Sequence, residues 1–459
     1  TAGALGLRLT FARQTERMEE RVAADVAQTR ADLEELVRIP GCAFPGFLDE
    51  EIDRACQKVI DIYRSAGFPR VERLDIEGGK PAVVAEAPGP QGSPTVLLYA
   101  HYDVQPAGDV SLWHSPPFEP TVRDGRLYGR GAADDKSGVV IHAAVMRAFD
   151  GRPPCTLRVI VEGEEEWGGP FAEYPRTHPE LFSADAIVVA DVGNARLAEP
   201  TFTTALRGMA AVTVECRTLA GAVHSGMFGG PAPDALMALI TVLSTMRDAD
   251  GETAIEGISG FDWDGPDFDE SDFRDLAGVE PDQPLIGTGS ISSRLFSKPV
   301  VNVVGIDAPP TQGAVNAVIP YAKARVSLRV PPGLDAVAAR DALIRHLETH
   351  APWGVQVEVT PDVVGQGVRV DTSGPAYAAA RVAMQQAYGK PVQEIGAGGS
   401  IPLIDSLMAA VPEAEILLFG AQDPLARIHA PNESVDLGEL QRAVLAEALF
   451  IRNFGSVVP

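Results

Sequence analysis

Acidic residues and histidines follow several apolar runs of the chain at the points where those runs end. The run 95–100 leads directly into His101, and Asp103 follows two residues later. Because successive side chains of a β-strand alternate between its two faces, a strand that ends here directs His101 and Asp103 to the same side. Such a pair can hold a metal ion, or it can form a structural hydrogen bond.

Four other segments place acids or a histidine at strand ends or in the loops that follow them. They are "GRGAADDKSG" (129–138), "VEGEEEWGG" (161–169), "VVADVGN" (188–194) and "ARIHAPNES" (426–434). Ligands of open α/β sheets bind outside the carboxyl ends of the strands, so we expect these loops to meet at one edge of a sheet. The side chains that would meet there are His101, Asp134, Glu165, Glu166, Asp191 and His429.

So many carboxylates cannot stay ionised in one pocket without a cation, because their mutual repulsion raises their pKa values. Two divalent ions would balance three carboxylate ligands and one hydroxide, so the pattern predicts a two-metal hydrolase. Histidine and carboxylate ligands without a thiolate suit Zn²⁺, and they are also compatible with Mn²⁺ or Co²⁺. Taken singly, each segment has a simpler explanation, such as a solvated acidic face or a helix N-cap. Their occurrence together favours the metal centre.

The composition excludes several classes of protein. The 459 residues carry a formal net charge of −25, whereas nucleic-acid and anionic-membrane binders need basic clusters. We therefore expect no nucleic acid and no membrane as partner. The four cysteines have no CxxC spacing and are expected to be buried thiols. We find no apolar stretch that could span a bilayer and no signal peptide, so a cytoplasmic location is expected.

The elements that must position these residues follow from the periodicity of the apolar residues. We expect helices over 15–38, 48–66, 137–149 and 374–388, and strands over 81–86, 94–100, 156–162, 186–190 and 414–419. Strands that alternate with helices predict an α/β domain whose sheet is largely parallel.

The middle of the chain has a different pattern. The runs 209–218 and 322–332 alternate as half-exposed strands do, and 233–248 and 334–350 are typical of helices that pack on them. Two such halves predict a small α+β domain inserted into the first domain. Between the halves, 250–300 is rich in Asp, Gly and Pro and is expected to be irregular.

These observations give the expected domain boundaries. A catalytic domain is expected to have residues 1–207 as its first part and 372–459 as its second part. Residues 208–371 are expected to form an inserted lid and dimerisation domain.

The motifs resemble those of a family of metallopeptidases with two co-catalytic metal ions, which includes carnosinase, peptidase V, peptidase T, succinyl-diaminopimelate desuccinylase and the aminoacylases. "GRGAADDKSG", "VEGEEEWGG" and "GGSIP" (398–402) are most similar to the carnosinase-type dipeptidase branch. The resemblance covers nearly the whole chain. It implies a zinc-peptidase-like catalytic domain with a mixed, largely parallel sheet and a ferredoxin-like lid domain.

The resemblance also implies the metal ligands. His101 and Asp191 would hold one ion, and Glu166 and His429 would hold the other. Asp134, the first residue of the Asp pair, would bridge the two ions. Two divalent ions per subunit are therefore expected.

Two further residues receive catalytic roles from the resemblance. Asp103 would orient His101 by accepting the N–H of the ring nitrogen that faces away from the metal. Glu165 would be the general base, which takes a proton from the water between the ions and later passes it to the leaving amine. The peptide bond between Asp134 and Asp135 would be cis.

Residues of the inserted domain would complete the site. In similar enzymes the histidine of an "HSG" motif, here His224, reaches the active site of the other subunit and stabilises the oxyanion, which implies a homodimer. Arg329 is our choice for the free carboxylate of a peptide substrate, because a guanidinium binds carboxylates in a bidentate manner. Gly399 and Ser400 offer a backbone N–H and a hydroxyl to the same carboxylate. The simpler explanations are a surface histidine and an exposed arginine at a strand edge.

Asp191 favours one branch of the family. Similar dipeptidases and aminopeptidases tend to have Asp at this position, whereas deacylases and carboxypeptidases tend to have Glu. The expected function is therefore metal-dependent hydrolysis of dipeptides or very short peptides. An amidohydrolase acting on N-acyl amino acids and a carboxypeptidase, both with the same metal site, are the alternatives. A scaffold protein without activity is the third hypothesis, and the presence of every ligand and of Glu165 argues against it.

Overall fold

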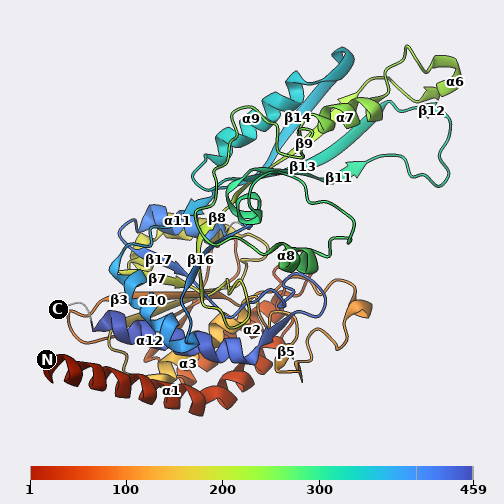
Figure 1. The fold of residues 1–459 in the computed structure, drawn as a ribbon. Helices are drawn as coiled ribbons and strands as arrows, with labels where there is room; N and C mark the ends of the chain where they lie inside the picture. Colours follow the sequence, from red (N-terminus) through yellow and green to blue (C-terminus); the bar gives the residue numbers. More distant parts are fainter. Residues whose placement is uncertain (1, 400, 457–459) are drawn as a thin grey trace. The chain divides into compact units, whose positions relative to one another are not determined.

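The computed structural model describes residues 2–399 and 401–456, and their fold divides into two compact units (Figure 1). The first unit comprises the chain up to Thr204, Val370–Glu394 and the chain from Ser406 on. The second unit comprises Ala205–Arg369 and Ile395–Asp405. An N-terminal and a C-terminal segment thus build the first unit together.

The first unit is organised around a six-stranded sheet of mixed, largely parallel strands, as the sequence predicts. Its order is β1 (Arg70–Leu74), β2 (Ala82–Ala87), β6 (Thr156–Glu162), β3 (Thr95–His101), β7 (Ala186–Val189) and β17 (Glu415–Leu418). Strands β6, β3, β7 and β17 run parallel to one another, and β1 and β2 are antiparallel to their neighbours. The central strands are buried on both faces and are therefore apolar almost throughout.

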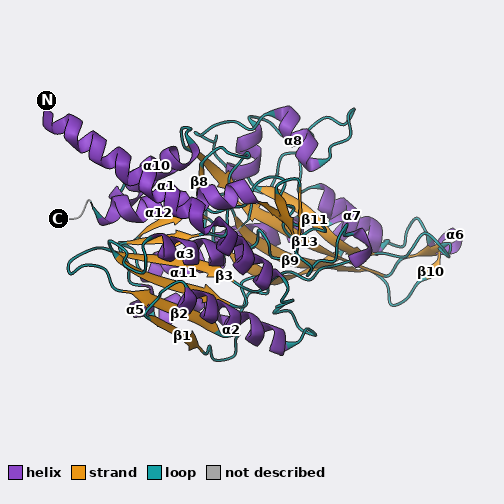
Figure 2. Ribbon diagram, turned by 90° about the horizontal axis from the view of Figure 1, so that it is seen from below, coloured by secondary structure: helices purple, strands orange, loops and turns teal. Residues whose placement is uncertain are grey.

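Helices pack against this sheet and against one another (Figure 2). They are α1 (Ala2–Val37), α2 (Asp49–Ser65), α3 (Lys136–Ala148), α10 (Pro375–Tyr388) and α12 (Leu437–Gly455). Helix α3 is buried along nearly its whole length, which explains why apolar residues lie on all sides of it. Helix α1 begins earlier than the predicted residue 15, because no proline interrupts the preceding segment.

A small sheet places two of the predicted site loops beside each other. It consists of β18 (Ser434–Asp436), β5 (Arg126–Tyr128) and β4 (Thr121–Arg123), in that order. Ser434 pairs with Tyr128 in this sheet. The loop that carries His429 leads into β18, and the chain leaves β5 toward Asp134. The short helices of the N-terminal segment are η1 (Val110–Leu112), η2 (Pro170–Glu173), α4 (Tyr174–Thr177) and α5 (Pro179–Phe182).

The second unit is an α+β structure, consistent with the expected inserted domain. Its four-stranded antiparallel sheet has the order β11 (Val300–Asp307), β13 (Tyr321–Val330), β9 (Gly208–Arg217) and β14 (Gln356–Gly365). Helices α7 (Ala235–Ser244) and α9 (Ala336–Thr349) pack on this sheet, so the residues of β13 alternate between buried and more exposed.

Shorter elements complete the fold. The 250–300 segment contains α8 (Glu270–Ala277) and the helical turn η3 (Ser293–Ser297) and is otherwise irregular, as expected. The others are β10 (Val223–His224), α6 (Ser225–Phe228), β12 (Ala317–Val318), η4 (Pro352–Gly354), β15 (Val368–Arg369), β8 (Thr201–Leu206), β16 (Gln393–Ala397) and α11 (Pro402–Ala410). Strands β15, β8 and β16 form a three-stranded sheet.

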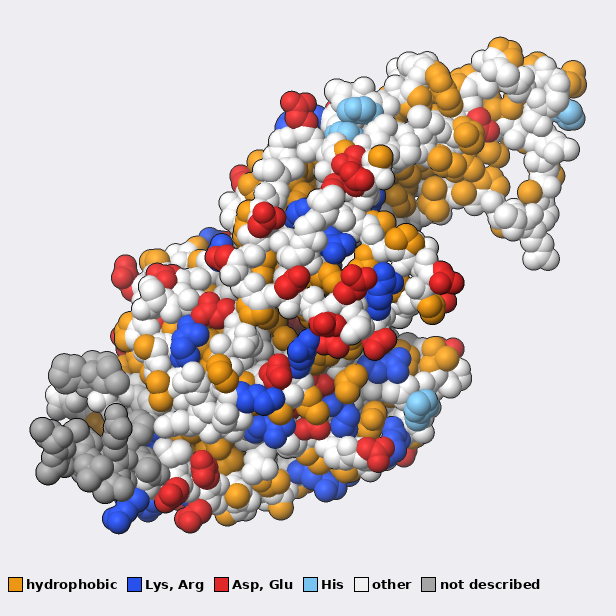
Figure 3. Space-filling view, viewed as in Figure 1, with side chains coloured by type: hydrophobic (Ala, Val, Ile, Leu, Met, Phe, Trp, Pro, Cys, Tyr) orange, Lys and Arg blue, Asp and Glu red, His pale blue; other side chains and the backbone are white. Residues whose placement is uncertain are grey.

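Apolar side chains gather on one surface of the second unit (Figure 3). Met237 and Ile240 of α7 are about half exposed, and so are Val303, Val304 and Ile306 of β11. Strand β11 is an edge strand of its sheet, so this surface combines unpaired backbone groups with exposed apolar side chains.

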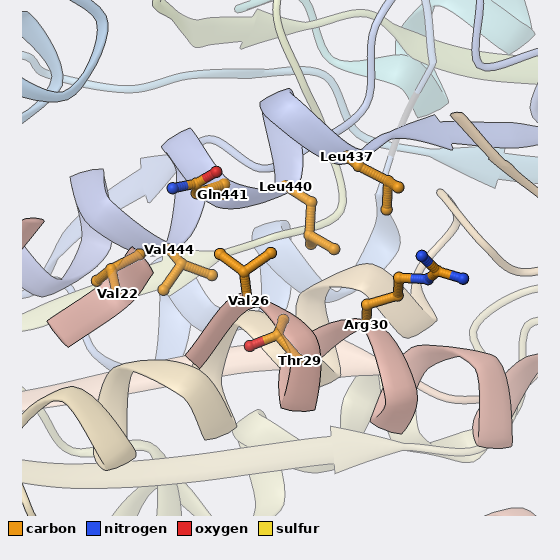
Figure 4. Close-up of a pocket in the computed structure, with 8 residues that line it drawn as sticks. All are labelled: Val22, Val26, Thr29, Arg30, Leu437, Leu440, Gln441 and Val444. Atoms are coloured by element: carbon orange, nitrogen blue, oxygen red, sulfur yellow. The ribbon is translucent and has the colours of Figure 1, made fainter. Parts of the chain in front are cut away.

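A shallow apolar groove lies between α1 and α12 in the first unit (Figure 4). It is lined by Val22, Val26, Thr29, Arg30, Leu437, Leu440, Gln441 and Val444. None of these residues comes from the loops that the sequence predicts to do chemistry. This groove is therefore a packing feature of the two helices.

Two predictions about the whole chain can be compared with the structure. Cys42, Cys56, Cys155 and Cys216 are all buried and free, as their spacing predicts. Among the helices in the described part of the chain, none has the length and the apolar character needed to cross a membrane.

Candidate metal centre

Strand β3 and the turn after it place His101 and Asp103 together. Both side chains are fully buried, and Nδ1 of His101 lies 3.2 Å from the backbone oxygen and 3.3 Å from Oδ1 of Asp103. The two carboxylate oxygens of Asp103 also accept hydrogen bonds from the backbone N–H groups of Glu165 and Glu166, each at 3.1 Å. Asp103 therefore fixes the orientation of the ring and the position of the acidic loop after β6.

Asp134 lies between two histidines. Its Oδ1 is 3.1 Å from Nε2 of His101, and its Oδ2 is 3.0 Å from Nε2 of His429. The peptide bond between Asp134 and Asp135 is cis, as the resemblance predicts. Asp135 caps helix α3 by accepting a hydrogen bond from the N–H of Gly138 at 3.2 Å, where a Cβ atom would lie only 2.6 Å from the Asp135 carboxylate.

Each of the two histidines also faces a second carboxylate. Nε2 of His101 is 3.7 Å from Oδ1 of Asp191, which follows β7. Nε2 of His429 is 3.1 Å from Oε2 of Glu166. The contacts thus divide into two sets, and Asp134 is the one carboxylate common to both.

Two glutamines hold the outer carboxylates in place. Nε2 of Gln105 donates to Oε2 of Glu166 at 2.8 Å. Nε2 of Gln422 donates to Oδ1 of Asp191 at 3.2 Å. Neither glutamine was selected from the sequence. Gln105 could have been recognised from the sequence, because it lies two residues after Asp103 in the same strand-end segment.

The donor set suits divalent metal ions. The ligand atoms of His101, Asp134 and Glu166 lie within 4.8 Å of one another, and so do those of His101, Asp135 and Asp191. Imidazole nitrogens and carboxylate oxygens are ligands that Zn²⁺, Mn²⁺ and Co²⁺ accept. The residues present therefore fit a two-ion centre.

The pKa shifts of the site residues also favour bound cations. Burial, together with the charge of Asp134, raises the pKa of Asp191 to about 7. Burial, with the charge of Asp191, also raises the pKa of Glu165 well above its ordinary value. For Asp134, burial alone would raise the pKa, but hydrogen bonds from His101 and His429 lower it below its ordinary value. The acids hold more negative charge than the histidines can balance, so added cations would stabilise their ionised forms.

Glu165 has the freedom that a proton carrier needs. Its side chain is half-buried, and none of the described residues forms a hydrogen bond with its carboxylate. It is anchored through its backbone, whose N–H donates to Asp103 and whose oxygen accepts from the N–H of Gly168. Glu166, the next residue, is by contrast held by Gln105 and faces His429.

The remaining predicted site residues belong to the second unit. His224 is exposed, and its Nδ1 accepts a hydrogen bond from the N–H of Gly226 at 3.1 Å, which leaves Nε2 available. Gly399 is exposed, and Ser400 lies outside the described residues. The structure brings the six loop residues of the first unit together, and it places His224, Arg329 and Gly399 on a separate unit.

Arg329 has a neighbour that the sequence analysis missed. The side chain of Arg207 is buried, and its Nε has no hydrogen-bond partner in the described part of the chain. Burial and the charge of Arg329 lower the pKa of Arg207 to about 10. Within the described residues, neither arginine forms an ion pair with an acid. Their positive charges are therefore available to an anion.

The fold and the clustered ligands together define a metallopeptidase, an enzyme that hydrolyses peptide bonds with the help of metal ions. Residues 97–453 match the model of peptidase family M20/M25/M40, and the chain belongs to this family. This confirms the resemblance seen in the sequence.

Similar proteins include several dipeptidases. The chain is 40% identical to the cysteinylglycine-S-conjugate dipeptidase of Corynebacterium striatum over 371 residues, which cover 79% of this chain and 82% of that protein. Among solved structures, the di-peptidase Dug1p of Saccharomyces cerevisiae matches with a TM-score of 0.83 at 20% identity, over 97% of this chain and 99% of that one. Human carnosine dipeptidase 1 matches with a TM-score of 0.82 at 23% identity, over 96% and 99% of the two chains.

Proposed function

We propose that this metallopeptidase is a dipeptidase, which hydrolyses dipeptides or very short peptides with a free amino group by means of two divalent metal ions. The observation that carries the proposal is the position of Asp134, whose two oxygens each face a different histidine. The name of the Corynebacterium relative supports a dipeptide substrate.

The ligand sets follow the division of the contacts. His101 and Asp191 would hold one ion, and Glu166 and His429 would hold the other, with Asp134 between them. Zn²⁺ is the proposed metal, and Mn²⁺ or Co²⁺ would fit the same ligands. When bound, the ions would supply the Lewis acidity that activates a water molecule and polarises the scissile carbonyl.

Glu165 would move the proton. One of its carboxylate oxygens accepts the proton of the attacking water and then delivers it to the nitrogen of the leaving amine. Burial, which raises its pKa, favours the protonated form that the second step needs. Asp103 would keep the loop of Glu165 and the ring of His101 in a fixed relation throughout.

The substrate's free carboxylate would bind in the second unit. Arg329 is the proposed partner, with Gly399 and Ser400 as additional donors, and the unpaired charge of Arg207 adds to the attraction. A dipeptide with an amidated C-terminus tests this role. We expect its KM to rise at least tenfold, and an unchanged KM would contradict the role of Arg329.

We also propose that the enzyme is a homodimer in which His224 acts in the active site of the partner. The apolar surface on α7 and β11 supports a second copy of this chain as occupant, since an edge strand with exposed apolar side chains favours pairing. Analytical ultracentrifugation should show a dimer. The double variant Val304→Lys/Ile306→Lys should be monomeric and should lose most activity. A fully active monomer would contradict the proposal.

A panel of substrates tests the proposed function. Metal-stripped protein is reloaded with Zn²⁺, Mn²⁺ or Co²⁺ and given dipeptides, longer peptides and N-acetyl amino acids. We expect dipeptides to be cleaved fastest. Cleavage confined to N-acetyl amino acids would instead support an amidohydrolase. Release of C-terminal residues from long peptides would support a carboxypeptidase. No cleavage of any of these substrates would support a scaffold. The cytoplasmic location stays a prediction of the sequence, which cell fractionation can test.

A further inference from the structure

A buried glutamate binds the backbone of the loop that carries Asp134. The side chain of Glu433 is 1% exposed, and each of its oxygens accepts two hydrogen bonds. Oε2 accepts from Nη1 of Arg130 at 2.7 Å and from the N–H of Gly131 at 3.0 Å. Oε1 accepts from the N–H of Ala133 at 3.0 Å and from the N–H of Asp134 at 3.1 Å.

Glu433 itself lies in the other loop of the metal centre, the one that carries His429. It lies four residues after His429 and directly before β18. Its own backbone oxygen accepts a hydrogen bond from the N–H of Gly129 at 3.0 Å, which extends the pairing of β18 with β5. One residue therefore connects the loop of His429 with the loop of Asp134, although about 300 residues separate them in the sequence.

The charge of Glu433 is balanced within the same group of contacts. The guanidinium of Arg130 is 2% exposed, forms the ion pair with Glu433 and lies 5.3 Å over the ring of Trp113. A buried ion pair contributes little net stability by itself, because the desolvation of both charges offsets their attraction. The presence of this pair is therefore better explained by what its hydrogen bonds position than by net stability.

We propose that Glu433 is a positioning residue for the metal centre, which holds the loops of Asp134 and His429 at the separation that both ions require. This inference rests on the proposed function. A hydrogen bond to the N–H of Asp134 fixes the backbone from which the shared carboxylate extends. Outer contacts of this kind orient metal ligands, and their loss lowers metal affinity or activity 10–100-fold, on the order seen for other metal sites.

The test is a calorimetric titration of the metal-stripped protein with Zn²⁺. The variant Glu433→Gln keeps the shape of the side chain, but its amide NH₂ group faces N–H groups that donate hydrogen bonds to the carboxylate in the wild type. We expect the affinity for at least one Zn²⁺ to fall about 10–100-fold, and activity to recover in excess Zn²⁺. A merely structural residue would not give recovery by metal. A folded variant whose two Zn²⁺ affinities stay within about twofold of wild type would overturn the inference.

A matched control is available in Glu415. Its carboxylate also accepts two backbone N–H groups from a distant segment, those of Ala376 and Tyr377, at 2.8 and 3.0 Å. Glu415→Gln should leave both Zn²⁺ affinities unchanged, and an equal loss in this variant would contradict a specific role for Glu433. If Glu433→Gln does not fold, Arg130→Lys provides the test, with a smaller loss of Zn²⁺ affinity expected and no loss contradicting the inference.

The titration separates this inference from the proposed function. Wild-type protein that fails to bind two Zn²⁺ ions would refute the metal centre itself. Wild-type protein that binds two ions, together with an unaffected Glu433→Gln variant, would refute only the role of Glu433.

Discussion

Two acid-rich regions of the molecule shift the pKa values of their carboxyl groups in opposite directions. In the metal centre, burial raises the pKa of Asp191 to about 7, and the neighbouring acids add to the effect. In the 250–300 segment of the second unit, Glu252 is also partly buried, and burial alone would raise its pKa. Hydrogen bonds from Lys298 at 2.9 Å and from the N–H and hydroxyl of Thr288 at 2.6 and 2.7 Å instead lower the pKa of Glu252 to about 2.

The difference shows what makes a group of acids a candidate metal site. In the 250–300 segment, Lys298 supplies the cation and Thr288 the N–H donor for Glu252, so this acid is compensated within the segment. The backbone N–H of Ser292 likewise lowers the pKa of Asp267 there. In the metal centre the acids chiefly face histidines and one another. Acidic composition alone therefore does not predict a metal ion. The metal centre differs in that several buried acids lie close to one another and to histidines.

The largest effect is expected at Glu165. The variant Glu165→Gln should lose about 10³-fold in kcat, because a general base contributes on the order of 10²–10⁴-fold, while Zn²⁺ binding stays intact. Steady-state kinetics and a Zn²⁺ titration measure the two properties separately. The neighbouring Glu164→Gln is the control, since the Glu164 carboxylate binds the N–H of Lys80 instead. Equal losses in both variants would count against Glu165 as the base.

Removal of the metal ions should loosen the loops of the metal centre and leave the 250–300 segment unchanged. Zn²⁺ at about 100 times its dissociation constant should stabilise the folded protein by about 2.7 kcal/mol, because it binds only the folded state. Thermal unfolding with and without a chelator measures this. Hydrogen exchange should then increase in the loops of Asp134 and His429 and stay unchanged in 250–300. Exchange that increases equally in both regions would contradict the comparison.

A smaller effect is expected at Asp103, which contacts His101 and the acidic loop at once. Asp103→Asn keeps one oxygen but turns an NH₂ group toward donors, so we expect kcat/KM to fall about 10–100-fold. Steady-state kinetics at saturating Zn²⁺ measure the loss. An activity within twofold of wild type would show that Asp103 does not position its neighbours.

The smallest effect is expected in the second unit. Glu252→Gln should lower the free energy of unfolding by about 1 kcal/mol at pH 7, since the carboxylate is hydrogen-bonded but only partly screened from solvent. Because its pKa is lower in the folded state, the stabilisation is fully present above about pH 4.5 and disappears as the pH falls toward 2. Urea unfolding of both proteins between pH 2 and 7 measures the difference, and a constant difference would contradict the assignment.

The sequence predicted the parts of the site that depend on local patterns. Apolar runs with a strand's periodicity, each followed by an acid or a histidine, were enough to predict a largely parallel sheet, and they bring His101 and Asp191 together in the structure. Parallel strands end at the same edge, so no long-range information was needed.

Contacts between distant loops could not be predicted in this way. Glu433 is surrounded by ordinary loop residues in the sequence, and its four donors come from another segment. Arg207 is likewise unremarkable in sequence, since only the fold shows that it is buried and near Arg329. Both cases depend on backbone geometry, which residue types and spacing do not encode locally.

The paired ions are the central claim, and anomalous diffraction from crystals grown with Zn²⁺ tests it most directly. Data collected at the zinc absorption edge should show two peaks in each chain. One should lie between His101 and Asp191, the other between Glu166 and His429, and both within bonding distance of Asp134. A single peak, or no peak among these side chains, would contradict the account.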